Sequence, residues 1–103
     1  MARSLILPIA EDDIVHLFEF HLDHSDRTAN AFADAVIEVV RRLELFPESG
    51  APREHIAKGL RVVPVQRFRA NVFYAVTKNG HAPLVTVLRV LRQERRVSRT
   101  DFE

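Results

Sequence analysis

The stretch 84–96, LVTVLRVLRQERR, limits the possible folds of this chain more than any other part of it. From Leu84 to Val90 the sequence is almost continuously apolar, and only Thr86 and Arg89 interrupt it. An apolar run of this length predicts a strand that is covered on both faces and is therefore central in its sheet. The positions that follow are strongly basic, so this strand is expected to carry a charged tip made of Arg92, Arg95, Arg96 and Arg99.

Two amphipathic helices are predicted upstream of that strand. A short apolar run over 3–9 predicts a first strand, which Pro8 ends because proline has no N–H to pair. Acidic residues followed by apolar residues at helical spacing predict a helix over 11–23. Ser25 and Asp26 are suitable caps for a second helix that Pro47 closes. Its expected buried stripe consists of Phe32, Val36, Val39, Leu43 and Phe46, widened by Ile37 and Val40.

After a turn over 47–52 the hydrophobic period changes from helical to extended. Residues 60–68 predict a strand in which Pro64 requires an edge or a bulge, and residues 71–78 predict the next one. Asn79-Gly80 is a strong turn signal before the apolar strand. The expected order is β-α-α-β-β-β, an α+β fold in which an N-terminal helical hairpin packs on an antiparallel sheet. We expect a single domain over 1–103.

Charge is divided unevenly between the two halves of the chain. Residues 1–50 carry four arginines against ten acids, a net charge of −6, whereas residues 51–103 carry eleven cations against four acids, a net charge of +7. Nine of those eleven cations are arginine, the side chain best suited to a bidentate grip on carboxylate or phosphate. This asymmetry favours a basic face that meets an anionic partner, and the alternative is a solvated face balanced by the acidic helices.

Several classes of protein and site are excluded or disfavoured. There is no apolar run of eighteen residues and the N-terminal apolar patch is too short for a signal peptide, so a cytoplasmic location without membrane attachment is expected. The absence of cysteine excludes disulfides and cysteine-based zinc sites. His21 and His24 lack a third ligand nearby, so they are expected to be solvated at the end of a helix. No metal and no cofactor are expected.

Three local patterns carry a resemblance to a known family. The sequence Pro47-x-x-Gly50-x-x-Arg53 follows the second helix, Leu60-Arg61 begins the next strand, and the segments 72–76 and 87–91 form the last two strands. In this order they resemble the RelE/ParE superfamily of bacterial toxins from type II toxin–antitoxin pairs. The last strand and its basic end look more like the ParE branch, although that branch often has histidine where this chain has Arg92.

The resemblance implies one of three functions. ParE-type members inhibit DNA gyrase and are neutralised by a ParD-like antitoxin, so our leading hypothesis is a toxin of this type that acts by binding. RelE-type members cut messenger RNA on the ribosome, which makes an mRNA endonuclease the alternative. A third possibility is a degenerate member that binds its partner and has lost toxicity. Fold alone does not choose among these functions.

The residues needed for RNA cleavage look incomplete. Such cleavage without metal requires proton transfer and stabilisation of the phosphate charge. Arg61 could match one basic position of the RelE-type enzymes, but Val63 stands where a second lysine would be expected. No tyrosine follows the last strand, where Phe102 is the only aromatic residue, and Tyr74 is expected in the core with its hydroxyl satisfied. We therefore predict no catalytic residues.

The arginines of the second half are the candidate contacts for a protein partner. An antitoxin tail that folds on binding is expected to place apolar anchors in a groove beside the helical hairpin and sheet, and direct nucleic-acid binding is not expected. Arg89 interrupts an apolar strand, so it must either meet the partner or form an internal salt bridge with a helix carboxylate. The predicted partner-binding residues are Arg61, Arg67, Arg69, Arg89, Arg92, Arg95 and Arg96.

Overall fold

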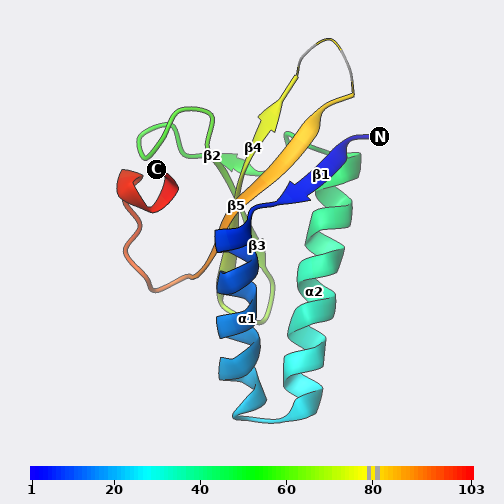
Figure 1. Ribbon diagram of the computed structural model, residues 1–103, viewed down its shortest axis with the longest axis vertical. Helices are drawn as coiled ribbons and strands as arrows, with labels where there is room; N and C mark the ends of the chain where they lie inside the picture. The colour runs from blue at the N-terminus through cyan, green and yellow to red at the C-terminus, as the bar shows by residue number, and fades with distance from the viewer. Residues whose placement is uncertain (79, 81) are drawn as a thin grey trace.

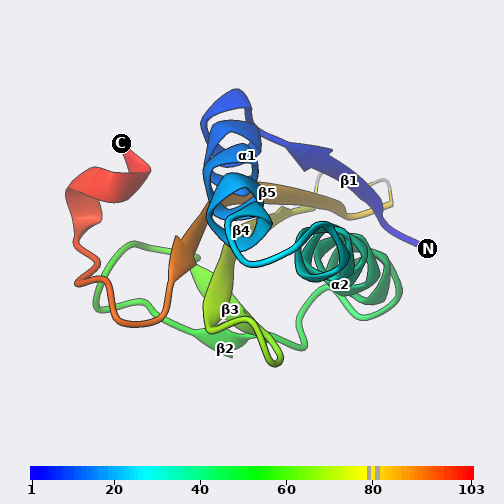
Figure 2. The ribbon, with the colours of Figure 1, turned by 90° about the horizontal axis from the view of Figure 1, so that it is seen from below.

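The fold of the chain, taken from a computed structural model that describes residues 1–78, 80 and 82–103, is a helical hairpin on a five-stranded sheet. Along the chain the elements are β1 (Arg3–Ile6), α1 (Pro8–Leu22), α2 (Asp26–Leu45), β2 (Ala51–Pro52), β3 (Arg61–Val65), β4 (Ala70–Thr77), β5 (Leu84–Arg92) and a C-terminal 3-10 helix, η1 (Arg99–Phe102). The strand order is β1-β5-β4-β3-β2, and α1 and α2 lie side by side on one side of this sheet (Figures 1 and 2). The predicted α+β fold is confirmed.

Strand β5 is an interior strand with a neighbour on each side, as the apolar run predicts. It pairs in parallel with β1 and antiparallel with β4, and its buried valines Val85, Val87 and Val90 face the helices. A bulge opposite Phe73 and Tyr74 leaves Leu88 unpaired, because Tyr74 pairs with Val87 while Phe73 pairs with Arg89. One extra residue reverses the alternation of faces, so Val87 and Val90 both reach the same core.

The two helices begin and end close to their predicted limits. Helix α1 begins at Pro8 rather than at residue 11, because proline suits the first helical position, where its missing N–H has no acceptor anyway. The predicted cap of α2 is confirmed, since the Ser25 hydroxyl accepts from the Thr28 N–H at 3.0 Å. The predicted burial of Phe46 is wrong, because α2 ends at Leu45 and Phe46 is 62% exposed; Ile37 is also exposed, at 50%.

Strand β3 is shorter than predicted, and the two-residue β2 beside it was not predicted. Strand β2 pairs only with Arg61 and Val62, so Pro64 lies where β3 has no outer neighbour. The expected edge position of Pro64 is therefore confirmed. A tight turn over 66–69 joins β3 to β4. The turn predicted at Asn79-Gly80 falls partly outside the described residues.

The sheet has apolar residues on both faces. The larger core lies between the sheet and the helical hairpin and includes Phe32, Leu43 and Tyr74. On the opposite face Leu60, Phe73 and Leu91 are buried under the C-terminal segment, where the Phe102 ring lies 5.3 Å from the Phe73 ring. Among the described residues, no helix is long and apolar enough to cross a membrane.

Candidate partner-binding surface

The loop that carries the Pro-x-x-Gly pattern is fastened to the core by one tyrosine. The Tyr74 hydroxyl donates to the Pro47 carbonyl and accepts from the Gly50 N–H, both at 2.8 Å. Tyr74 is fully buried, so its predicted place in the core is confirmed. Burial raises the pKa of the Tyr74 hydroxyl, which keeps it protonated as the donor that the loop requires. This tyrosine holds structure and faces no open site.

Glycine is required at position 50 because Tyr74 approaches its backbone so closely. A β-carbon at Gly50 would lie 2.6 Å from the Tyr74 hydroxyl oxygen and 2.9 Å from the Val62 carbonyl oxygen. Gly50→Ala is therefore expected to lower the free energy of unfolding by about 1–3 kcal/mol. Urea unfolding checks this, with Ala51→Ser, an exposed neighbour, as the control. Equal stability of the Gly50→Ala protein and the unmodified protein would contradict the role given to this glycine.

The guanidinium of Arg61 holds the same loop. It donates to the carbonyl of Gly50 at 2.8 Å and to the carbonyl of Glu48 at 3.0 Å. Glu48 in turn pairs with Lys78 at 2.6 Å, and this hydrogen bond lowers the pKa of the Glu48 carboxyl group. Arg61 therefore lies apart from the other predicted contact residues, and its charged group is already engaged with the backbone.

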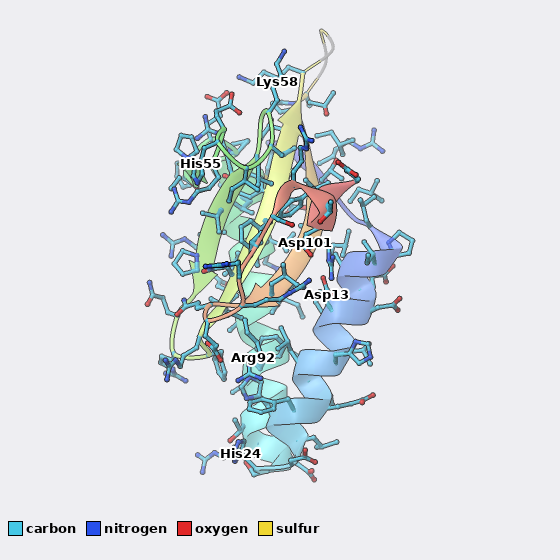
Figure 3. The ribbon with its side chains drawn as sticks, turned by 90° about the vertical axis from the view of Figure 1, so that its left-hand side faces the viewer. Asp13, His24, His55, Lys58, Arg92 and Asp101 are labelled. Carbon is cyan, nitrogen blue, oxygen red and sulfur yellow. The ribbon has the colours of Figure 1, made fainter. Side chains whose placement is uncertain are left out.

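Arg89 forms the internal salt bridge that was one of its two alternatives. Its guanidinium binds both carboxylate oxygens of Asp13 on α1, at 2.7 and 2.9 Å, and the side chain is only 13% exposed. A further bond of 3.2 Å runs to the carbonyl of Asp101, and Figure 3 shows Asp13 and Asp101 close together. The hydrogen bonds with Asp13 raise the pKa of Arg89, so this arginine keeps its charge.

Asp13 also completes the sheet where β1 ends. The last backbone bond between the β1 segment and β5 runs from the Leu7 N–H to the Val87 carbonyl. Three residues after this valine along β5, the Asp13 carboxylate accepts from the Val90 N–H at 3.0 Å. Helix α1 thus supplies one acidic side chain in the position that a neighbouring strand would otherwise fill.

Three of the predicted arginines gather around a cleft of about 220 Å³, which we name the arginine cleft. Arg67 and Arg69 come from the turn between β3 and β4, and Arg92 comes from the end of β5. In Figure 3 Arg92 lies toward the same end of the molecule as His24. The cleft is also lined by one acidic residue, Glu94, and by the rings of Phe20, His21 and Phe68.

The arginines lie against the aromatic rings of this cleft. The guanidinium carbon of Arg92 is 4.9 Å from the centre of the Phe20 ring, and that of Arg67 is 5.8 Å from the centre of the Phe68 ring. Such contacts hold a cation over an apolar surface and leave its N–H groups available at the edge. The Glu94 carboxylate takes one side of Arg92, at 2.7 Å, and Arg92 remains 52% exposed.

The backbone of the turn is unusual at both of its arginines. Arg67 has a φ of 73° and Arg69 a φ of 53°, in the left-handed region where a β-carbon is unfavourable. The Gln93 N–H donates to the Arg69 carbonyl at 2.8 Å, which ties the turn to the end of β5. This geometry brings two guanidiniums from the turn to the same cleft as Arg92.

His21 is not solvated, so its predicted exposure is wrong. It lies in the last turn of α1 with 8% exposure, and its ring is 5.0 Å from the Phe32 ring and 5.4 Å from the Phe68 ring. Burial lowers the pKa of His21 below its usual 6.5, and the positive charges of His24 and Arg92 lower it further. Within the part of the chain that the structure describes, no three acidic or histidine side chains are placed to hold a metal ion.

The last two predicted arginines lie on the segment between β5 and η1. Arg95 binds the Asp101 carboxylate at 2.6 Å, and Arg96 is exposed. The seven predicted residues therefore do not form one cluster. Three line the arginine cleft, two lie on the C-terminal segment, and Arg61 and Arg89 make internal contacts.

The sequence of this chain matches a known protein family. The family model described as "ParE toxin of type II toxin-antitoxin system, parDE" matches residues 5–97. The chain belongs to the ParE toxin family. Its fold is similar to that of a chain in a solved structure described as "Chromosomal ParDE TA system from P. aeruginosa", with a TM-score of 0.76. The two chains share 19% identity, and the match covers 91% of this chain and 98% of that one. No curated protein matches it.

This ParE-family chain has a second concave surface between α2 and the edge of the sheet. The groove has a volume of about 380 Å³ and lies between α2 and β3. Its walls include Ala35, Val39 and Leu43 from α2 and Val63 and Val65 from β3. Glu38 and Arg42 also line this α2 groove, so it combines an apolar interior with charged groups of both signs.

Proposed function

We propose that this ParE-family chain inhibits DNA gyrase by binding and is held inactive by a ParD-like antitoxin in the cytoplasm. One observation favours a binding function over RNA cleavage. Arg61 and Tyr74, the residues whose side chains come closest to those that an RNase needs, already make internal hydrogen bonds. Both are committed to the loop 47–50, where Arg61 donates to carbonyls and Tyr74 is fully buried. Neither is free to move a proton or to hold a phosphate during a reaction.

The antitoxin is proposed to use both concave surfaces. An amphipathic antitoxin segment that folds on binding would place apolar side chains in the α2 groove, in the manner of a helix in a groove. Its acidic residues would meet the arginine cleft and the C-terminal segment. The proposed contacts are the exposed arginines Arg67, Arg69, Arg92, Arg95 and Arg96, while Arg61 and Arg89 support the surface from within.

Expression of the chain without its antitoxin tests the proposed toxicity. Induced expression in a bacterial host should arrest growth, and co-expression of a short neighbouring gene that encodes an acidic amphipathic tail should restore growth. Continued growth on induction, with the protein present and folded, would reject toxicity and leave a binding protein that has lost its effect.

The charge of the arginine cleft is expected to control antitoxin affinity. Arg92→Glu should weaken antitoxin binding more than tenfold, which corresponds to about 1.4 kcal/mol or more, because it places a repulsive charge in the cleft. Titration calorimetry with the purified antitoxin measures this change. Arg41→Glu, an exposed position on α2, is the matched charge reversal and should change affinity far less. Unchanged affinity of the Arg92→Glu protein would reject the proposed contact.

The runner-up function is an mRNA endonuclease that acts on the ribosome. The arginine cleft favours it to the extent that aromatic rings beneath guanidiniums also suit single-stranded RNA. Cleavage of transcripts on translating ribosomes, with loss of cleavage on changing Arg61, would promote this function over gyrase inhibition.

A further inference from the structure

The arginine cleft holds more positive charge than its own residues offset. Arg92 pairs with Glu94, but within residues 1–78, 80 and 82–103 neither Arg67 nor Arg69 forms an ion pair. The rim thus presents three guanidiniums against one carboxylate. An added anion would find N–H donors on two elements of the fold, the β3–β4 turn and the end of β5.

The backbone of the turn supports a role for these side chains beyond stability. Glycine or asparagine adopts the left-handed region at less cost than arginine, yet Arg67 and Arg69 both occupy it. An unfavourable backbone conformation at two positions so close together is typical of residues whose side chains serve a function. The arrangement places a guanidinium on each side of Phe68 along the chain.

His21 lines the same cleft as the three arginines, so its pKa depends on the charge that is bound there. The charged groups around it are His24 just after the end of α1, Arg92 and Glu94 at the end of β5, and the two arginines of the turn. Helix α2 contributes the uncharged ring of Phe32. The native state thus binds a proton less readily than the unfolded chain, so this group costs stability as pH falls below 6.5.

We propose that the arginine cleft is a proton-linked carboxylate site: a carboxylate of a partner protein binds between Arg67, Arg69 and Arg92, and His21 beneath it takes up a proton from solvent. The inference rests on the proposed function in so far as the antitoxin supplies that carboxylate. The cleft suits a carboxylate that lies next to an apolar or aromatic side chain. The rings of Phe20 and Phe68 give the cleft an apolar surface, and the cleft volume of about 220 Å³ accommodates one side chain.

A protein carboxylate suits this surface better than the phosphates of a nucleic acid. Nucleic-acid binding draws much of its affinity from several cations that neutralise successive phosphates of the backbone. Here acidic residues interrupt any such row of cations beyond the cleft, because Arg95 pairs with Asp101 at 2.6 Å and Arg99 pairs with Glu103 at 3.5 Å. Glu94 interrupts it at the cleft itself.

The pKa of His21 in the full-length protein tests the proposal directly. Its imidazole proton resonances are followed by NMR across a pH titration in N-acetyl-L-glutamate α-methylamide, which offers one side-chain carboxylate, and in chloride of equal ionic strength. The carboxylate probe should raise the His21 pKa by about one unit or more, because an added anion reduces the positive charge that opposes protonation of the imidazole. An equal titration in both solutions would overturn the proposal.

A second arm replaces the carboxylate with dimethyl phosphate, which mimics a nucleic-acid phosphodiester. A smaller pKa change than with the carboxylate supports a protein partner, whereas a larger one overturns that assignment. Failure of either arm leaves growth arrest and its relief by the antitoxin untouched, so the site and the toxin function fail separately.

Variants of the turn separate binding from folding. Arg69→Gly removes a guanidinium and suits the left-handed backbone, so the protein should be at least as stable as the unmodified chain. In this variant the pKa change that the probe causes at His21 should be at most one third of the change in the unmodified protein at the same probe concentration. Arg67→Gly provides an independent repeat. Arg99→Gln, on the exposed side of η1, should leave the effect of the probe unchanged. A full effect in both glycine variants would overturn the role of the turn.

Discussion

Replacing Asp13 with alanine is expected to lower the free energy of unfolding by about 3–5 kcal/mol. The change leaves the Arg89 guanidinium, only 13% exposed, without its bidentate partner. It also removes the acceptor of the Val90 N–H on the interior strand β5. Urea denaturation followed by circular dichroism measures the loss.

Asp12→Ala is the matched control, because Asp12 is the preceding residue of α1 and is exposed. It should change stability by less than about 0.5 kcal/mol. A double variant, Asp13→Ala with Arg89→Met, should recover much of the loss, since it no longer buries a charge that has lost its closest partner. Stability of the Asp13→Ala protein within error of the control would show that the pair does not hold α1 to the sheet.

Phe32→Ala is expected to cost about 3–5 kcal/mol, because Phe32 is fully buried between the helical hairpin and the sheet. Its ring also contacts His21 and Phe68, whose ring centres lie at 5.0 and 5.7 Å. Phe46→Ala removes the same atoms from a side chain that is 62% exposed, so it should cost less than about 1 kcal/mol. Thermal unfolding of the two proteins compares them, and similar losses would contradict the burial assigned to α2.

Sequence patterns predicted the elements of this fold better than their limits. The apolar run of β5 and the stripe of α2 were sufficient for a helical hairpin on a sheet, because both patterns extend over many residues. The helical pattern wrongly included Phe46, because α2 ends one residue earlier. Strand β2 was missed because its two residues are too few to show a hydrophobic period. The parallel pairing of β1 with β5 joins residues far apart in the sequence, such as Arg3 and Leu84, so no local pattern indicates it.

The arginines of the candidate site were visible in the sequence, but their separate roles were not. An arginine in an apolar strand is compatible with a partner or with an internal carboxylate, and Asp13 lies 76 residues away. Only the packing of α1 across the end of β1 brings the two together. Phe20 and His21 were likewise not predicted to line a site, although the alternation Arg67-Phe68-Arg69 at a strand end was a usable signal.

A supercoiling assay with purified DNA gyrase tests the central claim, binding without catalysis, most directly. The full-length chain should inhibit supercoiling, pre-incubation with the antitoxin should abolish the inhibition, and translated messenger RNA in a parallel reaction should stay intact. Normal supercoiling at saturating protein, together with cleaved transcripts on translating ribosomes, would contradict the account and identify the chain as an endonuclease.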